Sequence, residues 1–177
     1  MNKKLVMTLS GQDRVGLVEH ITKRILDYHG NVEESCMSRL GGEFAVLMLI
    51  SVPEDKFTGL QDGLSSLKDE GFKLSTSSTD AGTGTKYSGW VPYQIEVNGA
   101  DHEGIVHTIT EKLAEKNVNI ENMGTRTVKA PMSGIPLFMM KGTILVPPEI
   151  HYHKLQKEFR QIGDDLNVDV EIEPYKN

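Results

Sequence analysis

The chain has 177 residues, of which 38% are hydrophobic and 25% charged, as in ordinary globular proteins. Its net charge is −6 and neither half has a basic excess, which argues against direct binding to nucleic acid. No stretch approaches the about 18 apolar residues of a membrane span, and the single cysteine, Cys36, excludes an intrachain disulfide and a zinc site built from cysteines. We therefore expect a cytoplasmic protein that binds neither membrane nor nucleic acid and holds no metal or cofactor.

The N-terminal half predicts the element order strand, helix, strand, strand, helix, strand. Apolar residues alternate in the expected strands and recur at spacings of three and four in the expected helices. We expect Gly30 to end the first helix and Gly41-Gly42 to form the turn of a hairpin. The expected strands cover residues 5–9, 32–40, 43–52 and 72–77, and the expected helices cover residues 17–26 and 57–67.

The C-terminal half predicts the same order, after a small and polar segment with the composition of a linker. His151 and His153 alternate where a helix is expected to begin, and they lack a third spaced ligand. This pattern predicts surface residues and not a metal site. The expected strands cover residues 93–97, 120–128, 137–146 and 168–172, and the expected helices cover residues 104–117 and 155–166.

The two halves repeat one sequence at an offset of 88 residues. Residues 11–18 read GQDRVGLV, and residues 99–106 read GADHEGIV. An internal repeat of this length indicates two copies of one small domain. We expect domains over residues 1–79 and 91–177, joined by a linker over residues 80–90.

This element order is that of the split βαβ, ferredoxin-like fold, an α+β architecture. Each domain is expected to hold a four-stranded antiparallel sheet with both helices on one face. The third strand is apolar on both faces, because Val46 and Met48 alternate with Ala45 and Leu47, and residues 137–140 repeat this pattern. Exposed apolar side chains are costly, so we expect the sister domain or another chain to cover the second face.

Both copies carry Gly-x-Asp-x-x-Gly between the first strand and the first helix. We call these segments the first corner (residues 11–17) and the second corner (residues 99–105). Glycines permit backbone conformations closed to other residues and let a ligand approach closely. A helix N-terminus offers unpaired N–H groups to a carboxylate, and an aspartate beside it can accept an ammonium group. A corner is thus a plausible receptor for a free amino acid; alternatively, Asp13 and Asp101 cap their helices.

These motifs resemble the ACT domain, a βαββαβ regulatory module that binds amino acids. The resemblance rests on the two corners, on GNVEE at residues 30–34 and on NVNIEN at residues 117–122. The second hairpin carries APMSGIPLF at residues 130–138 in place of the two-glycine turn. That insertion is similar to the tandem ACT proteins of the glycine cleavage system transcriptional repressor type.

In ACT domains the ligand lies at a domain interface, against the first turn and the start of the second strand. The resemblance implies that an aspartate of the corner and an asparagine of the second strand contact the amino acid, while backbone N–H groups near the glycines take its carboxylate. Glu103 places negative charge near the second site, which departs from what a carboxylate pocket requires. The implied ligand-binding residues are Gly11, Asp13, Arg14, Gly16, Leu17 and Asn31 in the first copy, and Gly99, Asp101, Gly104, Ile105 and Asn119 in the second.

The resemblance implies a non-catalytic regulator, a homodimer that binds a small amino acid such as glycine or serine and acts on a regulatory protein partner. One alternative is a ligand-free module for protein interaction or assembly, which would use the sheet faces and edges. Another is an acylphosphatase-like hydrolase that uses Arg14 on an anion. The second copy has His102 at that position, and the Gly-rich basic loop of such enzymes is absent.

Overall fold

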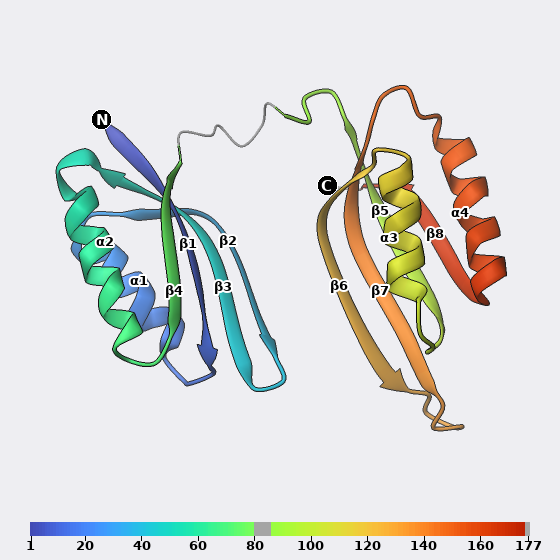
Figure 1. Cartoon of the computed structure of the whole chain (residues 1–177), viewed down its shortest axis with the longest axis horizontal. Coiled ribbons are helices and arrows are strands. Elements are labelled where there is room, and N and C mark those ends of the chain that lie inside the picture. Colours follow the sequence, from blue (N-terminus) through green and yellow to red (C-terminus); the bar gives the residue numbers. More distant parts are fainter. Residues whose placement is uncertain (80–85, 176–177) are drawn as a thin grey trace. The chain divides into compact units, whose positions relative to one another are not determined.

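The computed structural model describes residues 1–79 and 86–175. The chain forms two compact units, Met1–Gly82 and Thr83–Asn177, and each has the element order that its sequence predicts (Figure 1). Of the expected linker over residues 80–90, residues 80–85 lie outside the described part. Within that described part, no helix combines the length and the hydropathy needed to cross a bilayer.

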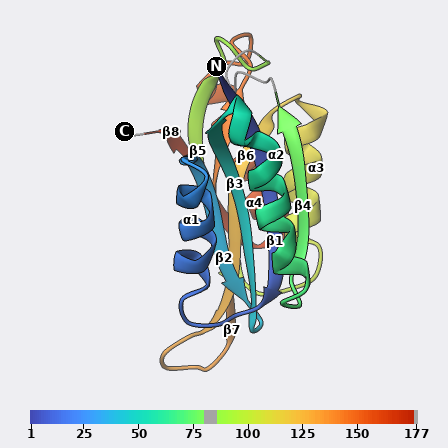
Figure 2. The same ribbon diagram turned by 90° about the vertical axis from the view of Figure 1, so that its left-hand side faces the viewer.

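The first unit is a four-stranded antiparallel sheet in the order β2-β3-β1-β4. Helices α1 and α2 pack side by side on one face of this sheet (Figure 2), which confirms the predicted fold. The elements are β1 (Asn2–Gln12), α1 (Leu17–Asp27), β2 (Asn31–Leu40), β3 (Glu43–Pro53), α2 (Phe57–Ser65) and β4 (Lys73–Thr79), with 3-10 turns η1 (Glu54–Lys56) and η2 (Ser66–Lys68) on either side of α2.

The second unit repeats this architecture, with the sheet order β6-β7-β5-β8 and two helices on one face of the sheet (Figure 1). His151 and His153 are exposed at the start of its second helix, as predicted. The elements are β5 (Val91–Ala100), α3 (Ile105–Glu115), β6 (Asn119–Lys129), β7 (Pro136–Val146), α4 (Tyr152–Leu166) and β8 (Val168–Pro174).

The two hairpins differ in their turns, as their sequences predict. Gly41 and Gly42 have φ angles of 58° and 89°, which a two-residue hairpin turn requires. The second hairpin instead carries a loop over residues 130–135, in which the Ala130 amide donates to the Ile135 carbonyl at 2.9 Å. This hydrogen bond within the loop closes the connection between β6 and β7.

The end of α1 differs from the expectation placed on Gly30. The left-handed residue is His29, with a φ of 57°, and its repeat equivalent Asn117 has a φ of 56°. A Cβ on Gly30 would instead come within 2.8 Å of Cγ2 of Ile25. The glycine therefore permits close packing after the helix, while a polar residue one position earlier makes the left-handed turn.

Each unit has its own core between the helices and the sheet. In β3, Val46 and Met48 are buried, whereas Leu47 between them is 50% exposed. The predicted division of this strand into two apolar faces is thus confirmed, and the cover over the second face stays a prediction. The cores include Leu5, Met7, Leu9, Ile21, Ile25, Leu60 and Leu64 in the first unit, and Ile95, Val97, Ile109, Leu113, Leu155 and Phe159 in the second.

Candidate functional site

Each corner places a left-handed glycine at the start of a helix. Gly16, with a φ of 85°, is the N-cap of α1, and Gly104, with a φ of 92°, is the N-cap of α3. Among the described residues, no side chain caps either helix. The alternative in which Asp13 and Asp101 act as caps is therefore wrong, because each stands three residues before the capping glycine. The first amides of both helices consequently lack a side-chain acceptor.

The other glycine of each corner serves packing. Gly11 lies in β1 and Gly99 in β5, both as extended residues. A Cβ on Gly11 would come within 2.5 Å of Cδ1 of Phe72, and a Cβ on Gly99 would come within 3.0 Å of Cα of Val168. The expectation that these two glycines adopt conformations closed to other residues is therefore wrong. They leave room for the segment that enters the last strand of each unit.

The corner aspartates are held by the hairpin of their own unit. Oδ2 of Asp13 accepts from Nη1 of Arg39 at 3.4 Å, and Oδ2 of Asp101 accepts from Oγ1 of Thr127 at 3.3 Å. The backbone amide of each aspartate also donates to a carbonyl of that hairpin at 3.0 Å. The two carboxylates therefore have the same placement, but they differ in their hydrogen-bond donor, a guanidinium for Asp13 and a hydroxyl for Asp101.

The basic residue of each corner reaches the end of the second helical segment of its unit. Arg14 forms an ion pair with Glu70, and its guanidinium lies 4.9 Å from the centre of the Phe72 ring. At the equivalent position, Nε2 of His102 lies 2.8 Å from the carbonyl oxygen of Leu166, the last residue of α4. Arg14 is therefore engaged by a carboxylate, which does not fit the anion-binding role that a hydrolase would require of it.

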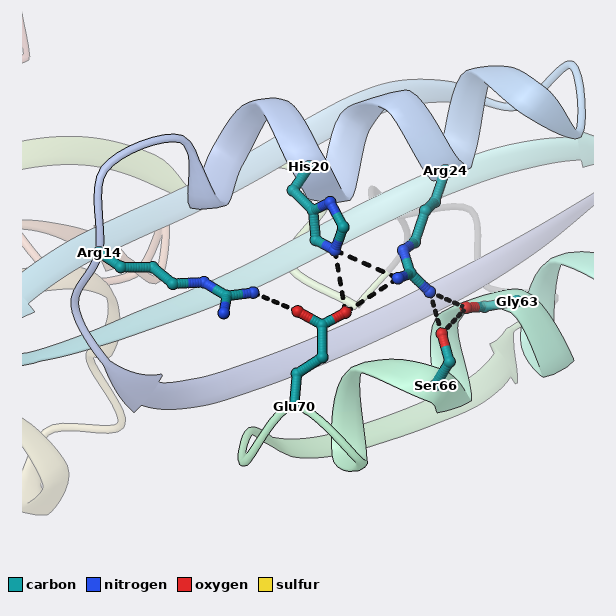
Figure 3. Close-up of polar contacts among 6 residues, drawn as sticks. All are labelled: Arg14, His20, Arg24, Gly63, Ser66 and Glu70. Carbon is teal, nitrogen blue, oxygen red and sulfur yellow. Dashed lines mark hydrogen bonds and ion pairs between the residues drawn. The ribbon is translucent and has the colours of Figure 1, made fainter.

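Glu70 gathers basic groups from two elements (Figure 3). Its Oε1 lies 2.9 Å from Nε2 of His20 and 2.9 Å from Nη2 of Arg24, both on α1, and Arg14 reaches it from the corner. The hydrogen bonds from His20 and then from Arg14 lower the pKa of Glu70 to about 2. Arg24 also donates to the carbonyl of Gly63 at 2.7 Å. The cluster thus ties the first corner and α1 to the end of the second helical segment.

Sequence reasoning did not identify this cluster. The residue of the second copy equivalent to His20 is Thr108, so the repeat does not single out His20, and Arg24 corresponds to Lys112, a basic residue of the kind usual on a helix surface. Their spacing of four residues places them on the same face of α1, which is the signal that could have found them.

Leu17 and Ile105 can offer only backbone groups to a ligand. Their side chains are 2% and 1% exposed, because both begin their helices facing the core. The Leu17 amide donates to the Arg14 carbonyl at 3.3 Å. The groups that a corner can present are therefore the amides of the first helical turn and the aspartate carboxylate.

The predicted asparagines lie at the opposite end of the sheet from the corners. Asn31 pairs with Ser51, whereas Gln12, which ends β1 at the corner, pairs with Glu43. Eight residues of β3 separate these two levels, about 26 Å in an extended strand. Asn119 is displaced by the same number of residues along β7. One small amino acid cannot touch the corner and the asparagine of the same unit.

Several hollows lie on the second unit, and two of them border the strand that leads into the second corner. One of about 520 Å³ lies on the face of the sheet away from the helices, with Glu96, Arg126, Met139 and Lys141 in its lining. Another of about 250 Å³ includes Gly99 and the segment between α4 and β8. The larger hollow has no counterpart at the first corner among the hollows described, so the duplicated corner, and not hollow size, defines our candidate site.

Comparisons with known proteins define the class. The sequence profile of the ACT domain matches residues 3–76. The chain is 34% identical over 80 residues to a UPF0237 protein of Methanopyrus kandleri, a match that covers 45% of this chain and 82% of that protein. The βαββαβ fold of both units agrees with this match. The chain belongs to the ACT-domain proteins.

Longer matches relate it to a particular group within this class. The chain is 25% identical over 166 residues to the glycine cleavage system transcriptional repressor of Escherichia coli, covering 93% of this chain and 86% of that one. A solved structure of an unknown protein from Galdieria sulphuraria has a TM-score of 0.86 at 30% identity, covering 99% and 100% of the two chains. A second solved structure, with a proposed assignment as such a repressor, shares the fold at a TM-score of 0.70 and 21% identity, covering 100% and 99%.

Proposed function

We propose that this chain is a non-catalytic regulatory protein that binds a small amino acid at ACT-unit interfaces and passes that binding on to a protein partner. Glycine and serine are the first candidates for the ligand, and a transcriptional regulator of amino-acid metabolism is the partner. The observation that carries the proposal is the duplicated corner. In both units a left-handed glycine opens the helix without a side-chain cap, three residues after a carboxylate.

The corner suits the two charged ends of a free amino acid. The first amides of α1 and α3 carry the partial positive charge of a helix N-terminus and can donate to the ligand carboxylate. Asp13 or Asp101 accepts from the ligand ammonium. Asp13 is paired with Arg39, whereas Asp101 accepts from the Thr127 hydroxyl and lies near His102, so the two corners differ in affinity for an amine.

A second ACT unit completes each site. The asparagine that the family resemblance assigns to the ligand lies about 26 Å from the corner of its own unit. An asparagine that contacts the same ligand therefore comes from another unit, and a homodimer supplies one. This requirement links ligand binding to assembly, and a ligand shifts an assembly only as far as its affinities for the two arrangements differ.

The non-catalytic part of the proposal is supported by Arg14, which is occupied by Glu70. The protein partner is supported by the relative that is described as a transcriptional repressor. The net charge of −6 does not favour contact with the DNA backbone, so action through another protein is the simpler route.

The test is a thermal-shift screen of the twenty amino acids. A ligand at 100 times its dissociation constant should stabilise the chain by about 2.7 kcal/mol. The double variant Asp13→Ala, Asp101→Ala should lose the shift while its ligand-free Tm stays close to that of the wild type. Asp62→Ala, which removes an exposed carboxylate of α2, is the control and should keep the shift. A flat response to all twenty amino acids would contradict the proposal.

A flat response would favour the interaction module, for which the first unit offers a specific surface. Leu40 is 73% exposed and Leu47 50%, and the register of the β2–β3 hairpin places both on the face of the sheet away from the helices. Sedimentation of the ligand-free chain would then be decisive, because an assembly module should associate without any amino acid.

A further inference from the structure

His102 links the second corner to the end of α4 through both nitrogens of its ring. Nε2 lies 2.8 Å from the carbonyl oxygen of Leu166, and Nδ1 lies 2.9 Å from the carbonyl oxygen of Glu103. A neutral imidazole has one N–H donor and one lone pair, so it can donate to only one of these oxygens. The imidazolium has two donors and satisfies both.

The surroundings of the ring favour its charged form. Leu166 ends α4, where the last carbonyls lack partners within the helix and carry a partial negative charge. The hydrogen bond to the Glu103 carbonyl, and next that to the Leu166 carbonyl, raise the pKa of His102, and the Asp101 carboxylate acts in the same direction. The charged residues on the segments that meet here are all acidic: Asp101, Glu103, Asp164, Asp165 and Asp169.

The first corner makes the equivalent contact through a guanidinium, and His20 of α1 also lies against the carboxylate that it reaches. Arg14 occupies the position equivalent to His102, and its guanidinium reaches Glu70 just after η2. A guanidinium stays charged throughout the physiological pH range, whereas an imidazole changes its charge within that range. The two corners therefore share a contact but differ in its dependence on pH.

We propose that His102 is a positioning residue that makes the contact between the second corner and α4 sensitive to pH. Its imidazolium holds the corner against α4, and loss of the proton gives up one of the two contacts. The consequence for ligand binding rests on the proposed function. While the His102 imidazolium contacts α4, the amides of the first turn of α3 keep the arrangement that binds a carboxylate. The second corner therefore binds an amino acid more tightly at low pH than at high pH.

The contact is tested first without ligand, by NMR titration of the full chain from about pH 5 to about pH 9. We expect the His102 ring to titrate above its ordinary pKa of 6.5, and the backbone amides of residues 103–105 and 166–168 to follow the same midpoint. The shifts at 166–168 should vanish in His102→Gln and stay at their low-pH values in His102→Arg. His153→Gln, which removes an exposed histidine of the same unit, should leave them unchanged. Amides at the end of α4 that ignore the His102 titration would overturn the proposal.

The consequence for ligand is tested by calorimetry with glycine and with serine, in the Asp13→Ala background that leaves the second corner intact. We expect the dissociation constant to rise about threefold to tenfold from about pH 6 to about pH 9. A tenfold rise corresponds to a difference of one pKa unit in His102 between the free and the bound protein. In His102→Arg the dissociation constant should stay constant over this range. Binding that is equal at all pH values would overturn the regulatory role while leaving the proposed function intact. If neither amino acid binds at any pH, the proposed function fails for glycine and serine, and so does the predicted dependence of ligand affinity on pH. The NMR titration then decides by itself whether His102 positions the corner.

Discussion

Gly99 and Val168 approach so closely that one added carbon would not fit between them. A Cβ on Gly99 would lie 2.6 Å from Cγ1 of Val168 and 3.0 Å from its Cα. Gly11 meets Phe72 at the equivalent place in the first unit. The first glycine of each corner is therefore required by the packing of the closing strand, independently of any ligand.

We predict that Gly99→Ala destabilises the chain by about 1–3 kcal/mol, the usual cost of overpacking. The backbone of Val168 has to move, because a rotamer change cannot remove a contact with Cα. Gly124→Ala is the matched control in the same sheet, since a Cβ there would meet nothing within 4 Å, and we expect it to stay within about 0.5 kcal/mol of the wild type. Urea denaturation measures both. Equal stability of the two variants would contradict the prediction and would show that the backbone of β8 at Val168 can move without a measurable cost.

Leu47 and Met48 test the two faces of β3. Met48 is 1% exposed, so Met48→Ala should cost about 2–5 kcal/mol through the cavity that it leaves. Leu47 is 50% exposed, and Leu47→Ala should change the free energy of unfolding of the unit by less than about 1 kcal/mol. If another chain covers this face, sedimentation should show weaker association of Leu47→Ala. Unchanged association would leave the second apolar face without a role in assembly.

The fold follows from the sequence because its signals are local and repeated. The apolar run of β3 and the helical spacing in α1 each predict one element, and the second copy repeats both, while Gly41-Gly42 predicts the turn of the first hairpin alone. The end of α1 was misplaced by one residue, because glycine is the usual left-handed residue and the chain uses His29 instead. A polar residue in the left-handed region gives little signal in a single sequence.

The candidate site was harder to predict than the fold. The sequence alone does not distinguish a glycine with a positive φ, such as Gly16, from a glycine that leaves space for a neighbouring side chain, as Gly11 does for Phe72. The resemblance assigned Asp13 and Asn31 to one ligand site. In this topology β1 and β2 run parallel, so the end of β1 and the start of β2 lie at opposite ends of the sheet. Glu70 escaped notice because its partners come from distant segments, and because the residue equivalent to Arg14 in the second copy contacts the Leu166 carbonyl and not a carboxylate.

We predict that Glu70 contributes to a loss of stability of the first unit in acid. Its pKa is lowered from 4.5 to about 2 in the folded chain, so the stabilisation is fully present above the unfolded value and is lost as the pH falls through the folded one. In urea denaturation, the wild type should therefore lose more stability between about pH 5 and about pH 2 than Glu70→Gln, which cannot ionise.

Glu34→Gln provides the control for this comparison, because Glu34 is an exposed carboxylate of β2 in the same unit. Its acid profile should follow that of the wild type. A Glu70→Gln variant with the same profile as the wild type would show that the ion pairs with Arg14, His20 and Arg24 are too exposed to affect folding.

The loop over residues 130–135 should be dispensable for folding of the second unit. Lys129 and Pro136 form the last pair of the hairpin, as Leu40 and Glu43 do in the first unit, where two glycines suffice to connect the strands. Met132 is fully exposed and Ile135 is 54% exposed, so replacing residues 130–135 by Gly-Gly removes little buried area. A shorter loop also costs less entropy to close, so we expect the free energy of unfolding to change by less than about 1 kcal/mol. Circular dichroism melting measures this, and a variant that fails to fold would show that the loop packs against a surface in the native protein.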